Sequence, residues 1–135
     1  MKHAIQILVV DDSPVIIERL TLMLGEIPGV HVAGWAVDGS SAAWALQQQE
    51  PDAVVLDIKL GEDNGLDILT RFRAAMPITK FIMFTNYAQP PMRRACMKAG
   101  ADYFFDKSNE FQQMIDVLTG LVAEQGLQYE CFNED

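Results

Sequence analysis

The chain alternates short apolar runs with longer segments whose apolar residues recur at helical spacing. Five runs predict strands, at residues 5–10, 30–37, 53–56, 80–84 and 103–105. The first is almost continuously apolar, as expected of a strand buried on both faces. Apolar stripes predict helices over residues 16–27, 66–76, 91–99 and 111–122, and a further helix opens at Gly39. Five strand–helix repeats predict one parallel sheet with helices on both faces.

Length and pattern predict a single domain. A chain of 135 residues is close to the roughly 150 that one domain typically holds. No internal repeat or linker interrupts the pattern, so we expect one domain over residues 1–126. After Gly126 the period is lost, which predicts a short C-terminal tail over residues 127–135, frayed or docked on the surface, and no separate output domain.

Charge and cysteine content exclude several classes of function. The net charge of −9 repels phosphate backbones and anionic lipid, so the domain alone is expected to bind neither nucleic acid nor membranes. The longest apolar runs are too short to span a bilayer, and the amino terminus lacks a signal-peptide pattern. Cys96 and Cys131 do not make a disulfide framework. We therefore expect a cytoplasmic protein.

Two adjacent acids, Asp11 and Asp12, follow the first predicted strand directly. Ligands of open parallel sheets bind beyond the carboxyl ends of the strands, so this is a position where a site is expected. Carboxylates repel a phosphate but attract a hard cation such as Mg²⁺. The alternative is a helix cap, because Ser13 and Pro14 are typical of a helix start. One residue suffices for a cap, and two acids exceed that need.

A third acid, Asp57, ends the apolar run of the third predicted strand. On its own it is also compatible with an ordinary solvated loop acid. If the first and third strands are neighbours, as in the doubly wound order 2-1-3-4-5, Asp11, Asp12 and Asp57 converge on one crevice. Two carboxylates about 4 Å apart repel by roughly 4 kcal/mol at an effective dielectric constant of 20. Three together require a cation or a bound proton, and a divalent metal is the simpler solution.

The fourth and fifth predicted strands contribute a hydroxyl and an ammonium group. Thr85 ends the fourth strand, and Lys107 follows the fifth. Each alone is compatible with a structural or solvated role. Together, at neighbouring strand ends, they suit a tetrahedral dianion.

These five positions make the chain resemble the receiver domain of response regulators, the CheY-like phosphoacceptors of two-component signalling. The resemblance covers about residues 6–122, and the residues that carry it are Val-Val-Asp11-Asp12-Ser13, Val-Leu-Asp57, Gly65, Thr85, Ala99-Gly100-Ala101-Asp102 and Lys107. It implies the flavodoxin-like (CheY-like) α/β fold, a three-layer doubly wound sandwich of five parallel strands in the order 2-1-3-4-5 with five helices.

The resemblance also implies a role for each site residue. Asp57 is the implied phosphoacceptor, whose carboxylate attacks phosphorus. Asp11, Asp12, Asp57 and the backbone carbonyl of Lys59 are the implied ligands of Mg²⁺. Lys107, the Thr85 hydroxyl and the backbone amide of Asn86 are the implied contacts of the phosphoryl oxygens, as phosphoryl transfer depends on positioning and charge neutralisation.

A conformational switch is implied as well. In the family, phosphorylation draws the residue at Thr85 inward, and an aromatic side chain, here Phe104, fills the vacated space. The alternative for Phe104 is a permanently buried strand residue. The chain departs from the usual pattern at Gly61, where many receivers carry Pro, at Asn86, where Ala is frequent, and at Ser108, where Pro is typical. We expect these departures to affect the rates of the phosphorylation chemistry and the amplitude of the conformational switch, not the reaction itself.

The predicted function is a signalling switch rather than an enzyme. A sensor histidine kinase or phosphotransfer protein donates the phosphoryl group to Asp57, and the surface of the fourth helix, fifth strand and fifth helix then binds a downstream protein. The chain is expected to be a monomer or a phosphorylation-dependent dimer. The alternatives are a degenerate receiver that binds partners without phosphorylation, and a phosphohydrolase of the haloacid-dehalogenase type. The latter requires an Asp-x-Asp spacing that Asp11-Asp12 lacks.

Overall fold

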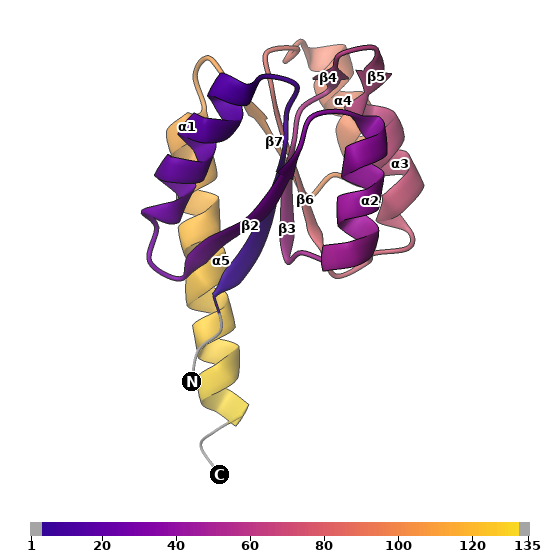
Figure 1. The fold of residues 1–135 in the computed structure, drawn as a ribbon. Coiled ribbons are helices and arrows are strands. Elements are labelled where there is room, and N and C mark those ends of the chain that lie inside the picture. The colour runs from indigo at the N-terminus through magenta and orange to yellow at the C-terminus, as the bar shows by residue number, and fades with distance from the viewer. Residues whose placement is uncertain (1–3, 133–135) are drawn as a thin grey trace.

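The main sheet contains five parallel strands, and all five lie where the sequence predicts them. The computed structural model describes residues 4–132. Within that range the strands are β1 (Ile5–Val10), β2 (Val30–Ala36), β3 (Ala53–Leu56), β6 (Lys80–Thr85) and β7 (Tyr103–Asp106). Their order is β2-β1-β3-β6-β7 (Figure 1). Because β6 and β7 are the fourth and fifth strands of this sheet, the predicted order 2-1-3-4-5 is confirmed.

Helices cover both faces of the sheet, which gives the predicted three layers (Figure 1). Their bounds are α1 (Pro14–Gly25), α2 (Gly39–Gln49), α3 (Gly65–Arg73), α4 (Pro90–Lys98) and α5 (Phe111–Phe132). Helices α1 and α5 pack on one face, and α2, α3 and α4 pack on the other.

The end of α5 corrects one prediction. The sequence pattern predicts that the chain after Gly126 is a frayed or surface-docked tail, but the helix continues to Phe132. Loss of an apolar stripe removes the signal of packing, not the ability to form a helix. Once a helix is nucleated, good helix formers such as Leu127, Gln128 and Glu130 extend it at little cost. Residues 133–135 of the predicted tail lie outside the described range.

The central strands supply both halves of the core, because successive side chains of a strand point to opposite faces. In β1, Ile7 and Val9 pack with α1 and α5, whereas Leu8 and Val10 pack with the other three helices. The strands β3 and β6 alternate in the same way. The near-continuous apolar runs are thus explained by burial on both faces.

A small antiparallel hairpin follows β3, at the edge where the strands end (Figure 1). It consists of β4 (Lys59–Leu60) and β5 (Asp63–Asn64), joined by a two-residue turn. The sequence analysis predicts no strands here, because strands of two residues are too short to show any alternation.

The order in which strands are added to the sheet reverses at β1, since β2 lies on one side of β1 while β3 lies on the other. A crevice is expected beyond the carboxyl ends of the strands at such a point. Backbone hydrogen bonds fix the loops there: Asp11 N–H donates to Ala36 O over 3.1 Å, and Asp57 N–H donates to Val10 O over 3.0 Å. Among the helices described in residues 4–132, none has the length and apolar character required to cross a membrane.

Candidate functional site

The loop after β1 separates the capping role from the acidic pair. Ser13 caps α1, its Oγ accepting a hydrogen bond from Ile16 N–H over 3.3 Å, and Pro14 occupies the first turn. Asp11 Oδ1 accepts from Ser13 N–H over 3.0 Å, which leaves Asp11 Oδ2 facing the crevice contacts described below. Ser13 is therefore the helix cap, and neither Asp11 nor Asp12 is needed for that role.

The loop after β3 fixes Asp57 with little freedom. Its Oδ1 accepts from Ile58 N–H over 2.7 Å, and the residue is only 7% exposed. Gly65 closes this loop, with its N–H donating to Ile58 O over 2.6 Å. A Cβ at Gly65 would lie 1.9 Å from the Asp57 carbonyl oxygen, so no residue with a side chain fits without moving the backbone of the Asp57 loop. This close approach is the physical reason for a glycine eight residues after Asp57.

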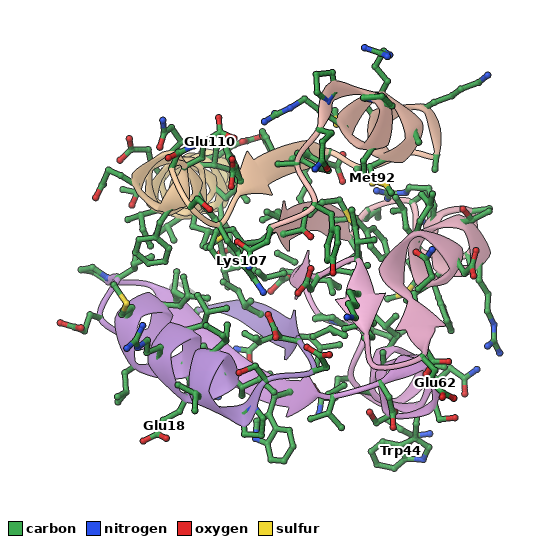
Figure 2. The ribbon with its side chains drawn as sticks, turned by 90° about the horizontal axis from the view of Figure 1, so that it is seen from above. Glu18, Trp44, Glu62, Met92, Lys107 and Glu110 are labelled. Carbon is green, nitrogen blue, oxygen red and sulfur yellow. The ribbon has the colours of Figure 1, made fainter. Side chains whose placement is uncertain are left out.

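The three acids meet as predicted, with Lys107 among them. One carboxylate oxygen each from Asp11, Asp12 and Asp57 lies within 4.8 Å of the others. Lys107 Nζ donates to Asp11 Oδ2 over 2.5 Å and to Asp57 Oδ2 over 2.7 Å. Seen from above the strand ends, Lys107 projects over the middle of the molecule (Figure 2). Four side chains from three loops that are remote in sequence therefore form one cluster.

Burial and pairing shift the proton equilibria of this cluster. Burial raises the pKa of the Asp11 carboxyl above its ordinary value, and hydrogen bonds from Lys107 and Ser13 only partly offset that rise. Burial alone would lower the pKa of Lys107, but hydrogen bonds to Asp11 and Asp57 raise it overall. The ammonium group therefore stays protonated and offsets part of the negative charge.

The donor set fits a hard divalent cation such as Mg²⁺. Carboxylate and carbonyl oxygens are the ligands that Mg²⁺ prefers, and the exposed Asp12 leaves room for the water ligands that it keeps. Lys59 begins β4 two residues after Asp57, with its side chain exposed. Its backbone carbonyl thus belongs to the loop that carries Asp57.

Thr85 and Lys107 lie at the ends of neighbouring strands. Thr85 pairs with Asp106 in the sheet register, and Lys107 N–H donates to Thr85 O over 2.9 Å. The Thr85 side chain is fully buried, and its Oγ1 accepts from Tyr87 N–H over 3.1 Å. Asn86 is exposed in the following loop. The structure thus places these residues at the same edge of the sheet as the acidic cluster.

Phe104 is buried, and one of its neighbours was missed by sequence reasoning. Phe104 packs on the side of α2, α3 and α4, opposite to Tyr103, as strand alternation predicts. The Arg93 guanidinium lies 4.7 Å from the centre of the Phe104 ring, and Arg93 also donates to Phe104 O over 3.0 Å and to Glu110 Oε1 over 2.8 Å. This side chain therefore links α4 to β7 and to Glu110, just before α5. The contact joins residues far apart along the chain, and no local spacing in the sequence predicts it.

Comparison with known proteins assigns the class of this fold and site. The family model described as the response regulator receiver domain matches residues 7–119. The chain therefore belongs to the receiver domain family of response regulators.

Individual relatives agree with this assignment. The chain is 32% identical to the probable transcriptional regulatory protein TcrX of Mycobacterium tuberculosis, over 91% of this chain and 52% of that protein. It is 28% identical to the response regulator GacA of Pseudomonas aeruginosa, over 90% of this chain and 56% of that protein. Thus it spans about half the length of these curated relatives. A CheY-like receiver domain protein from Methanospirillum hungatei has a similar structure, with a TM-score of 0.80, 25% identity and coverage of 93% of this chain and 98% of that one.

Proposed function

We propose that this receiver domain accepts a phosphoryl group on Asp57 and acts as a phosphorylation-driven switch. The observation that carries the proposal is the contact of the buried Asp57 carboxylate with Lys107 inside a cluster of three acids. In the proposed step an Asp57 carboxylate oxygen forms a bond to phosphorus. The bond between phosphorus and the donor breaks, and its electron pair leaves with the donor group.

The other residues of the site would bind and orient the group that is transferred. Asp11, Asp12, Asp57 and the Lys59 carbonyl would hold Mg²⁺, which when bound supplies positive charge to the phosphoryl oxygens. The Lys107 ammonium would pair with one phosphoryl oxygen. The Thr85 hydroxyl and the Asn86 backbone N–H would donate to others.

The conformational change that follows phosphorylation would pass from Thr85 to the face formed by α4, β7 and α5. When the Thr85 hydroxyl turns to a phosphoryl oxygen, it gives up its contact with Tyr87 N–H. Phe104 would respond by packing alone, since it lacks the hydroxyl of a tyrosine. Arg93 contacts both the Phe104 ring and Glu110. A shift of Phe104 would therefore move Arg93 and change its ion pair with Glu110, just before α5.

We propose a protein as donor and a protein as target. The donor would be a histidine kinase or phosphotransfer protein acting in the cytoplasm, because these supply the phosphohistidine that receivers use. The chain would not turn over a separate substrate as an enzyme does. Its net charge of −9 disfavours direct contact with nucleic acid.

Phosphorylation by acetyl phosphate tests the proposal without a known kinase. With Mg²⁺ present, intact-mass spectrometry should detect one added phosphoryl group, and the group should be absent when Mg²⁺ is chelated. Asp57→Asn should abolish the addition, whereas Asp67→Asn, which changes an exposed acid of α3, should not. Equal labelling of Asp57→Asn would refute the assignment of Asp57. A complete lack of labelling would favour a degenerate receiver that acts without phosphorylation.

A further inference from the structure

The hairpin turn beside the acidic cluster depends on Gly61. Two residues, Gly61 and Glu62, join the paired strands β4 and β5. Gly61 has a φ of +64°, and Glu62 is not among the residues with positive φ. A positive φ at the first turn position alone is typical of a type II′ hairpin turn, which favours glycine there. A proline at this position could not make the contact described next, because proline has no backbone N–H and its φ is fixed near −65°.

This N–H reaches across to the loop after β1. Gly61 N–H donates to Asp12 Oδ2 over 3.0 Å, between residues 49 positions apart in sequence. Asp12 is the exposed member of the acidic cluster, whereas Asp11 and Asp57 are buried. Packing therefore restrains the Asp12 carboxylate less than the other two. An exposed side chain normally samples several rotamers. The contact with Gly61 therefore restrains the member of the cluster that packing restrains least.

The rest of the hairpin is anchored as well. Asp63 Oδ2 accepts from Gly39 N–H over 2.8 Å at the start of α2. At the other end Gly65 N–H is bonded to Ile58 O over 2.6 Å. The hairpin is thus fixed at two points besides the contact with Asp12, and the direction of the Gly61 N–H is set by the fold.

We propose that Gly61 is a positioning residue for the metal site: its backbone N–H holds the Asp12 carboxylate toward Asp11 and Asp57, ready to take a divalent cation. The inference rests on the proposed function and deepens it. One Asp12 oxygen accepts the hydrogen bond, while the other remains for the cation. Preorganisation of this kind raises affinity because less side-chain freedom is lost on binding.

Mg²⁺ affinity of two variants at position 61 tests the proposal. Gly61→Pro removes the N–H, whereas Gly61→Asn keeps it, and Asn is, with Gly and Asp, a usual residue of type I′ and II′ turns. In titrations followed by amide chemical shifts, Gly61→Pro should weaken Mg²⁺ binding about fivefold, as expected for a ~1 kcal/mol hydrogen bond. Gly61→Asn should bind within about twofold of the wild-type chain. Equal affinity for Gly61→Pro and wild type, or equal weakening in both variants, would overturn the role of the N–H.

A second measurement does not depend on the folding of these variants. The exchange rate of the Gly61 amide proton with water should rise in Asp12→Ala, because its acceptor is gone, while that of Gly25 should not change. An unchanged Gly61 rate would overturn the inference. If wild type binds Mg²⁺ but Gly61→Pro binds it equally well, the proposed function stands and only this inference fails. If wild type shows no saturable Mg²⁺ binding, both fail.

Discussion

Removing the Lys107 ammonium should expose the repulsion that it offsets. Lys107→Met replaces the aliphatic part of the side chain with one of similar volume. Asp11 Oδ2 and Asp57 Oδ2 then lose the ammonium group that donates to both. All three side chains are well buried, with exposures of 11% for Lys107, 3% for Asp11 and 9% for Asp57. Solvent therefore screens the two carboxylates poorly.

The distance between the acids sets the magnitude. With carboxylate oxygens within 4.8 Å, two unit charges repel by about 3.5 kcal/mol at an effective dielectric constant of about 20. The pKa of Asp11, already raised by burial, should rise further once Lys107 is gone. A carboxyl with a raised pKa in the folded state binds protons more tightly there than when unfolded. Stability then falls as the pH rises from the ordinary Asp value of 3.8 through the raised value.

Urea unfolding of the metal-free proteins measures this effect. As the pH rises above the ordinary Asp value of 3.8, Lys107→Met should lose up to ~3 kcal/mol more unfolding free energy than wild type. Lys98→Met removes the same charge from an exposed position on α4 and should follow the wild-type profile. Excess Mg²⁺ should stabilise Lys107→Met more than wild type, because a cation replaces the lost one. Parallel profiles for Lys107→Met and wild type would refute the electrostatic reasoning.

Three further substitutions and one pH titration have definite expected outcomes. Asp12→Ala should weaken Mg²⁺ binding in a calorimetric titration, and unchanged affinity would exclude Asp12 as a ligand. Gly65→Ala should lower the thermal midpoint strongly, because the added Cβ would lie 1.9 Å from the Asp57 carbonyl oxygen. Arg93→Ala should cost about 1–2 kcal/mol in urea unfolding through its lost contacts with Phe104 and Glu110. Hydrogen bonds lower the pKa of Glu110, so its stabilising contribution should be complete above pH 4.5 and be lost in acid titrations as the pH falls through the lowered value.

The sequence predicts the cluster well because the site lies on the most regular part of the fold. Buried parallel strands give continuous apolar runs, and the residue that ends each run is easily read. Once the order of the strands is known, Asp11, Asp57 and Lys107 must end near one another. The strand order itself came from the family resemblance, since periodicity alone does not distinguish the possible arrangements of five parallel strands.

Other features depend on contacts that no local pattern records. Each strand of the β4–β5 hairpin has only two residues, which is too short for an alternation of apolar and polar residues to appear. Arg93 looks like one of several charged residues on a helix, and only the packing of α4 against β7 brings it to Phe104. The extension of α5 beyond Gly126 depends on propagation from an established helix, which a search for apolar stripes does not detect.

The position of the phosphoryl group tests the central claim most directly. After treatment with acetyl phosphate and Mg²⁺, reduction with borohydride converts an aspartyl phosphate to homoserine, which peptide mass spectrometry assigns to a residue. Homoserine at position 57, with Asp11 and Asp12 unchanged, is the predicted result. Homoserine at Asp11 or Asp12, or its absence from a protein that demonstrably binds Mg²⁺, would contradict the account.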